Sequence, residues 1–217
     1  LEVALKIENL QNGRADILVT LKERWYIFPV PYVELADRNF NDWWETHNHD
    51  FGRLEYGIAT SWDNLTGNRD ELYMVTQYGF TPKFEVFYER PYFSPNSDHG
   101  IGAFASIILN KNIPYSTFEN ELRFYEHPKF VRKRFRFGIQ HLKRQGIYGF
   151  HTTELKYNLN TIGDTVARLN PDYFLDGETK QQFLTASYTY THSKVDNRSY
   201  PLEGNFAEAT ISKRGLP

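Results

Sequence analysis

The stretch RKRFRFGIQHLK, residues 132–143, decides the fold class. Apolar and polar side chains alternate in it with a period of two, which is typical of a β-strand that has one apolar and one polar face. Successive side chains of a strand point to opposite faces, so the aromatic residues lie on one side and the arginines on the other. The alternating positions are Phe135, Phe137 and Ile139 against Arg134, Arg136 and Gln140.

The same alternation recurs along the chain, and no apolar stripe with a period of 3.6 residues lasts for three turns. The protein is therefore predicted to be all-β. A short hairpin is expected first, from residues 1–7 and 15–21, because Asn12-Gly13 between them suits a turn with positive φ. Further strands are expected at 27–37, 53–62, 71–80, 83–90, 101–110, 150–159, 183–192 and 205–212.

The composition excludes several classes of protein. The chain has 217 residues, and none of its apolar runs reaches the ~20 residues that a membrane-spanning helix needs. An aromatic content of 17% excludes a disordered chain, and a net charge of -2 gives no bulk attraction for nucleic acid. Cysteine is absent, which excludes disulfides and thiolate metal sites and suits an oxidising compartment.

Strands of soluble β-sandwiches also alternate apolar and polar residues. The periodicity alone therefore does not show whether the apolar face contacts lipid or a protein core. Strands of about ten residues with polar second faces and aromatic ends favour a transmembrane β-barrel. Short turns mixed with long polar loops, expected at 115–129 and 160–180, agree with a barrel.

Three ordered motifs resemble the BamA/TamA outer-membrane surface-antigen superfamily. They are NLTGN at 64–68, YERPYF at 88–93 and DNRSYPLEG at 196–204, and the segment 24–44 is similar to the first barrel strand of Bacteroidota-type members. The hairpin at 1–22 resembles the last strands of a POTRA domain, the periplasmic module that precedes the barrel. The motif residues, expected to be structural, are Thr66, Gly67, Asn68, Pro91, Tyr92, Phe93, Asp196, Arg198, Pro201 and Gly204.

This resemblance implies a domain division and a location. Residues 1–24 would be the end of a POTRA domain, and 25–217 the first half of a barrel with about nine of sixteen strands. The protein would lie in the outer membrane of a Gram-negative bacterium, with its N-terminal part in the periplasm. The V/I-R-G-F/Y loop and the aromatic C-terminal strand of the superfamily are missing from this sequence. A complete eight-stranded barrel is the alternative.

The resemblance also implies a function, the folding and insertion of nascent outer-membrane β-barrel proteins without enzymatic catalysis or a cofactor. An incoming client strand would add to the first barrel strand at a weakly paired seam. Accessory lipoproteins and lipid or lipopolysaccharide would be further partners, and nucleic acid would not. The residues expected at the seam are Ile27, Phe28, Pro29, Val30, Pro31, Tyr32 and Val33.

Alternatives to this function remain at the sequence level. They are a TamA-like role in translocation or lipid homeostasis, a barrel that anchors an upstream hydrolase domain, and a diffusion pore. The prolines at 29 and 31 lack the N–H donor and should weaken pairing at the seam, but they could instead only kink the chain where it leaves the periplasmic domain.

Other residue clusters carry weaker signals. His47, His49 and Asp50 have the spacing of metal ligands, yet their segment has the character of a polar loop, and we predict no metal site. Neither Ser187 nor Ser193 beside His192 forms a recognisable catalytic motif, and we predict no catalytic residue. In the basic cluster, Arg134 and Arg136 are expected to face the lumen, and the other members to lie at a membrane edge. Its members are Lys129, Arg132, Lys133, Arg134, Arg136, Lys143 and Arg144.

Overall fold

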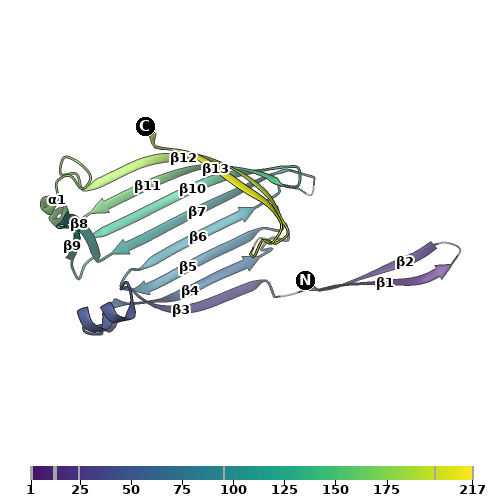
Figure 1. Cartoon of the computed structure of the whole chain (residues 1–217), viewed down its shortest axis with the longest axis horizontal. Helices are drawn as coiled ribbons and strands as arrows, with labels where there is room; N and C mark the ends of the chain where they lie inside the picture. Colours follow the sequence, from purple (N-terminus) through teal and green to yellow (C-terminus); the bar gives the residue numbers. More distant parts are fainter. Residues whose placement is uncertain (1, 12–13, 24, 95, 198, 217) are drawn as a thin grey trace.

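A computed structural model of the chain describes residues 2–11, 14–23, 25–94, 96–197 and 199–216 (Figure 1). Within these residues nine strands form one antiparallel sheet, in the order β13-β12-β11-β10-β7-β6-β5-β4-β3. The all-β prediction is confirmed, and each of the nine expected barrel segments overlaps one of these strands. Their bounds are β3 Ile27–Leu35, β4 Leu54–Asp63, β5 Glu71–Gly79, β6 Lys83–Arg90, β7 His99–Asn110, β10 Arg132–Gln145, β11 Gly149–Ile162, β12 Lys180–Val195 and β13 Gly204–Leu216.

The N-terminal hairpin forms a separate two-stranded sheet. Strand β1 (Glu2–Gln11) pairs with β2 (Arg14–Lys22), and Val3 lies opposite Leu21. The predicted Asn12-Gly13 turn lies outside the described residues. Figure 1 shows that this hairpin extends away from the large sheet. Its apolar side chains are exposed, with Leu5 71% accessible.

The register of the large sheet separates an outer apolar face from an inner polar face. Phe137 of β10 pairs with Ala105 of β7 and Tyr157 of β11, so these residues share the outer face. One position along, Arg136 pairs with Ser106 on the inner face, and its Nη2 donates to the Ser106 Oγ at 3.3 Å. The polar second face predicted from residues 132–143 is therefore confirmed.

The two ends of the sheet differ in their connections. At one end, here called the turn end, the strands are joined by 64–70, 91–98, 146–148 and 196–203. At the opposite end, the loop end, the connections are 36–53, 80–82, 111–131 and 163–179. Figure 1 shows the N-terminal hairpin on the side of the turn end.

Long connections are present where the long polar loops were expected, at 115–129 and 160–180, but they contain secondary structure. The connection 111–131 contains a hairpin of β8 (Asn112–Phe118) and β9 (Glu121–Glu126), and the connection 163–179 contains α1 (Asp164–Leu169). A π-helix, Asp42–Thr46, and a 3₁₀ helix, Phe51–Arg53, lie in the first connection. No helix in the described ranges is long and apolar enough to cross a membrane.

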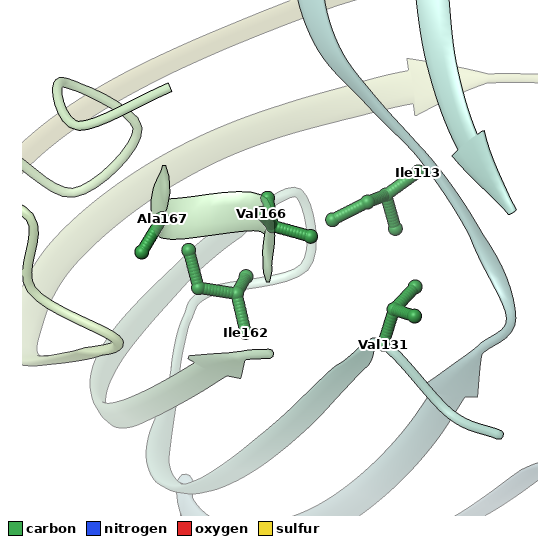
Figure 2. Close-up of a cluster of buried hydrophobic side chains, with 5 residues drawn as sticks. All are labelled: Ile113, Val131, Ile162, Val166 and Ala167. Carbon is green, nitrogen blue, oxygen red and sulfur yellow. The ribbon is translucent and has the colours of Figure 1, made fainter. Parts of the chain in front are cut away.

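A small buried core explains why these connections are ordered. Ile113, Val131, Ile162, Val166 and Ala167 come from separate segments of the loop end and pack together, as Figure 2 shows. Ile113 is 1% exposed and Val166 is fully buried. Each segment contributes only one or two apolar residues, and so no local period revealed the core.

Replacement of Ile113 by alanine should destabilise this loop-end core by about 2–5 kcal/mol, because the substitution leaves a cavity. Limited proteolysis should then cut 111–131 and 163–179 faster than in the wild-type protein. Leu122→Ala in the same hairpin is the matched control, since Leu122 is 56% exposed. Equal cleavage of the Ile113 variant and the Leu122 variant would contradict the assigned core.

Candidate functional site

The large sheet has two edges, formed by β3 and β13. Within the described residues β3 pairs only with β4, and β13 pairs only with β12. The closed eight-stranded barrel considered above is therefore not formed by these residues. The placement of β3 at an edge confirms what its two prolines indicated.

The backbone nitrogens of the two prolines in β3 point toward the open edge and not toward the neighbouring strand β4. Ala36 N–H donates to the Arg53 carbonyl at 2.9 Å, and Asp63 N–H donates to the Tyr26 carbonyl at 2.8 Å. Backbone groups of an antiparallel strand alternate in direction, so the even-numbered residues of β3 point toward β4. The odd-numbered residues, which include Pro29 and Pro31, point toward the open edge.

This direction has two consequences for pairing. The β3–β4 ladder keeps all its donors, and it runs in unbroken register from Ile27↔Trp62 to Leu35↔Leu54. The prolines therefore do not interrupt the strand, as a kink at the start of the barrel would. The open edge presents its carbonyls but lacks the donors of Pro29 and Pro31, so any strand added there forms fewer hydrogen bonds.

Side chains fix β3 to the inner face. The Tyr32 hydroxyl donates to Gln77 Oε1 at 2.9 Å. Gln77 Nε2 in turn donates to Glu55 Oε2 at 2.9 Å and to the Thr81 carbonyl at 2.7 Å. Because Gln77 is 5% exposed, this chain of hydrogen bonds is shielded from solvent.

The remaining seam residues make the edge apolar. Phe28, Val30 and Val33 are 40%, 58% and 69% exposed. A groove of about 620 Å³ lies beside the edge, on the outer face of β3–β5. The lining includes Pro31, Val33, Tyr56, Ile58, Met74 and Tyr78.

An aromatic cluster lies in the connection that follows β3. Trp43 is buried, and its Nε1 donates to the Asp50 carbonyl at 2.9 Å. The Trp44 ring stacks on His49 at 4.4 Å and on Phe40 at 5.6 Å between centroids. Trp44 is 51% exposed and Phe40 is 57% exposed, so the cluster presents aromatic surface at the loop end of β3.

Arg53 ties this connection to a distant hairpin. Its Nη2 lies 2.6 Å from Asp37 Oδ1, its Nη1 lies 3.2 Å from Glu126 Oε2 of β9, and its guanidinium lies 4.4 Å from the Phe80 ring centroid. Burial alone would lower the pKa of Arg53, but the hydrogen bonds and charges of Asp37 and Glu126 raise it above its ordinary value. No local pattern in the sequence indicates these contacts, because Glu126 is 73 residues from Arg53 along the chain.

The acidic groups near Arg53 do not form the site considered from the sequence. His49 stacks on Trp44, and Asp50 accepts from the Gly52 N–H at 2.8 Å. The carboxylates and imidazole that lie within 4.8 Å of one another are those of Asp37, Asp42 and His47. Asp37 already binds Arg53 through both carboxylate oxygens, at 2.8 and 3.0 Å from Nε.

The first two motifs are brought together at the turn end. Asp70 is 1% exposed and accepts from the Thr66 N–H at 3.0 Å and from the Tyr88 hydroxyl at 3.1 Å. Burial would raise the pKa of Asp70, but these hydrogen bonds outweigh burial and hold the pKa below its ordinary value of 3.8. Asn68 donates to the Thr66 hydroxyl at 2.9 Å, and Gly67 has a φ of +80°.

Arg90 completes the link between these motifs. Its guanidinium donates to the Asn68 side chain at 3.2 Å and to the carbonyls of Tyr92 and Phe93 at 3.1 and 2.8 Å. Pro91 follows it directly and begins the connection to β7. The two motifs therefore act together to shape adjacent turns.

The third motif forms the β12–β13 turn. Asp196 Oδ1 accepts from the N–H groups of Leu202 and Glu203 at 3.0 and 3.2 Å. Gly204 has a φ of +108°, and a Cβ there would lie 1.8 Å from the Lys194 carbonyl oxygen, so only glycine fits. Pro201 lies in this turn and is exposed, and Arg198 lies outside the described residues.

The basic cluster divides between the two faces of β10. Arg134 and Arg136 lie on the inner face as expected, and Arg136 Nη2 is 3.4 Å from Glu85 Oε1. Lys133 and Lys143 lie on the outer face near the two ends of the strand. The expectation was wrong for Arg132 and Arg144, which share the inner parity; the Arg144 Nη1 donates to the Tyr92 hydroxyl at 3.2 Å.

The serine and histidine residues of β12 lie on opposite faces of the sheet. The side chains of Ser187 and Ser193 lie on the inner face, and the side chain of His192 lies on the outer face. Neighbours in the sequence are therefore separated by the sheet, and a hydroxyl–imidazole pair is not formed by these residues.

Comparison with known proteins supports the fold. The crystal structure of BamA from Haemophilus ducreyi lacking POTRA domains 1–3 is similar to this chain, with a TM-score of 0.53 and 15% sequence identity. The match covers 100% of this chain and 39% of the BamA chain, so this chain spans about two fifths of that structure. No family model matches the sequence, and no curated protein matches it. The large sheet is therefore a BamA-like β-barrel fold.

Replacement of Asp70 by asparagine should remove a pH-dependent contribution to stability. The folded-state pKa of Asp70 lies below its unfolded value, so its stabilisation is present above about pH 4 and is lost as the pH falls through the folded pKa. Urea midpoints of the wild-type protein should therefore fall in acid, and those of Asp70→Asn should fall less. Asp172→Asn, an exposed loop-end change, should keep the wild-type pH profile. Identical acid slopes for Asp70→Asn and the wild type would refute the role given to Asp70.

Proposed function

We propose that this chain belongs to an outer-membrane assembly factor that folds and inserts β-barrel proteins at the open edge of β3. The observation that carries the proposal is the direction of Pro29 and Pro31, which leaves the β3–β4 ladder complete and the open edge short of two donors. The BamA-like fold supports the proposal but does not identify an activity.

The proposed mechanism is strand addition. In a bilayer each unpaired backbone N–H or C=O group costs several kcal/mol, so an open edge strongly favours an incoming strand. Backbone hydrogen bonds depend little on side chains, which suits a factor that accepts many different clients. Because two donors are missing, the client forms fewer bonds and can leave when its own strands close. Client folding itself supplies the driving force, and the role is non-enzymatic.

The dimensions of β10 agree with a membrane-spanning sheet. Lys133 and Lys143 lie near the two ends of the outer face of this strand, and the residues between them on that face are Phe135, Phe137, Ile139 and His141. About ten residues separate the two lysines, which corresponds to about 34 Å along the strand and roughly 25 Å across the bilayer at the usual tilt. This height is that of the apolar band in outer-membrane barrels.

The aromatic cluster fits a position at the membrane surface beside the seam. Tryptophan favours the boundary between lipid and water, and Trp44 is exposed at the loop end of β3. Arg53 holds this connection against β9, so the cluster is fixed relative to the edge.

The proposal includes an orientation and partners. The N-terminal hairpin, with residues 1–24, would be the end of a POTRA domain in the periplasm, and the turn end of the sheet would then lie on the periplasmic side. Nascent barrel proteins are the proposed clients. Accessory lipoproteins and lipid or lipopolysaccharide are proposed as further partners.

Cysteine cross-linking tests the edge directly. Val33→Cys and Val30→Cys should each form a disulfide with a stalled barrel client that carries a cysteine series along its terminal strand. The linked positions should shift in register between the two variants, because the strands pair residue by residue. These 217 residues contain no cysteine, so they contribute no background cross-link.

Ile58→Cys is the matched control, since Ile58 is also exposed on the outer face but its strand is paired on both sides. This control should not cross-link to the client. The proposal fails if Ile58→Cys links as well as Val33→Cys, or if neither position of β3 links.

Restoring the donors tests the role of the prolines. The double variant Pro29→Ala, Pro31→Ala should retain clients longer, because two hydrogen bonds of about 0.5–1.5 kcal/mol each slow dissociation by about 5- to 150-fold. A pulse-chase measurement of client release gives the rate. Pro114→Ala in β8 changes a proline away from the seam and should release clients at the wild-type rate. Unchanged or faster release from the double variant would exclude donor loss as the reason for weak pairing.

A further inference from the structure

A row of basic and imidazole side chains crosses the outer face near the turn end. Lys143 of β10 lies directly opposite His99 of β7 and opposite His151 of β11. His151 in turn lies opposite Tyr190 of β12. The row therefore spans four adjacent strands at one height of the sheet.

The row borders the apolar band. His141 is two residues from Lys143 on the same face, and the next outer positions of β10 are Ile139 and Phe137, which are 47% and 46% exposed. Going toward the turn end, the outer face thus changes from apolar to basic within one or two residues. Such a change marks the boundary between hydrocarbon and headgroups in a membrane protein.

Hydrogen bonds preorganise the imidazoles. Nδ1 of His99 lies 2.9 Å from Nε2 of His141, and Nε2 of His99 lies 3.3 Å from Asp98 Oδ1. An imidazolium form of His99 donates to both Asp98 and His141, and the remaining nitrogen of His141, Nδ1, then carries a hydrogen. A neutral His99 that donates to Asp98 instead accepts from His141 Nε2, and Nδ1 of His141 is then an acceptor. That nitrogen has no hydrogen-bond partner within the described part of the chain.

On the far side of Lys143, His151 is held by two contacts. Its Nδ1 lies 2.6 Å from the Tyr188 hydroxyl, and its Nε2 lies 2.8 Å from Gln145 Oε1. Both ring nitrogens of His151 thus have hydrogen-bond partners, which hold the ring in place at the side of Lys143. Lys143 is exposed between these histidines and has no ion pair among the described residues.

These side chains line a groove of about 570 Å³ on the outer face. Besides His141, Lys143 and His151, the lining includes Asp98, Arg144 and Tyr188. Lys143 is the permanent cation that faces this groove, because Arg144 has the inner parity and its guanidinium donates to the Tyr92 hydroxyl and to the carbonyls of Gly146 and Ile147. Asp98 contacts His99, so Lys143 remains available to an anion, and the groove continues into the apolar outer face. These two features fit a single kind of occupant.

We propose that this groove binds the phosphate headgroup of an anionic membrane lipid. Lys143 Nζ supplies the charge, and His141 Nδ1 adds a directed hydrogen bond to a phosphate oxygen when His99 is an imidazolium. The acyl chains then lie along the apolar outer face beside Ile139. The inference rests on the membrane placement proposed above and not on strand addition at β3.

Lipid retention tests this site. The intact protein, purified in detergent and stripped of lipid, is mixed with micelles that contain either phosphatidylglycerol or phosphatidylcholine, and bound lipid is counted by native mass spectrometry. The wild-type protein should retain phosphatidylglycerol in preference to phosphatidylcholine. Lys143→Gln should weaken phosphatidylglycerol retention by about fivefold, the effect expected of one basic residue at an anionic surface.

Two further variants separate binding from folding. Lys143→Arg keeps the charge and should keep most of the retention. Lys133→Gln removes an outer-face lysine at the loop end and should leave retention unchanged. Equal retention by Lys143→Gln and the wild type, or equal retention of the two lipids by the wild type, would overturn the proposal.

Two additional measurements identify the source of the phosphate and keep the two proposals apart. Excess inorganic phosphate should displace little phosphatidylglycerol, because it cannot use the apolar face; complete displacement would overturn the lipid as occupant. Client cross-linking to Val33→Cys should persist when Lys143→Gln is added. Loss of lipid selectivity with intact client cross-linking in the wild type would thus defeat the lipid site alone, and the reverse result would defeat strand addition alone.

Discussion

The pairing of backbone polar groups is the constraint on which the rest of this structure depends. In a bilayer the peptide groups of a sheet have no water to bind, so each must find a partner in a neighbouring strand. The seven inner strands of the large sheet, from β12 to β4, meet this requirement on both sides. The edge strands β3 and β13 are paired on one side only within the described residues. A sheet with a polar inner face and an apolar outer face can span a bilayer only when these edges are also paired. The chemistry of the edges therefore decides what the sheet can do.

The two edges differ in the donors that they offer. Asp196 N–H donates to the Glu203 carbonyl, so by alternation the odd-numbered residues of β13 face β12 and the even-numbered residues face outward. None of the outward positions from Gly204 to Ser212 is a proline, and the β13 edge keeps its donors. The β3 edge lacks those of Pro29 and Pro31. A strand paired with β13 can thus form a complete ladder, whereas a strand paired with β3 lacks two hydrogen bonds, which is the feature that the proposed strand exchange uses.

The sequence allowed one part of this arrangement to be predicted. Alternation with a period of two identified the nine strands and their faces, and proline identified β3 as an edge strand. The direction of the prolines depends on the register of β3 against β4, which no local pattern encodes. The contacts of Arg53 with Asp37 and Glu126, and the core around Ile113, also join residues distant in the sequence. The alignment of His99, Lys143 and His151 on one row likewise appears only when three strands are placed in register.

The position of β3 determines how strand exchange can occur. Its ladder with β4 is complete, Tyr32 is bonded to the buried Gln77, and the connection after it is held by Arg53. These contacts act on the side of β3 that faces the sheet or at its loop end, and none of them uses the backbone groups of the open edge. A partner strand can therefore leave without disturbing the bonds that keep β3 in place. In the proposed mechanism, β3 would therefore be a fixed template, and the seam would open by movement of the strand paired with it.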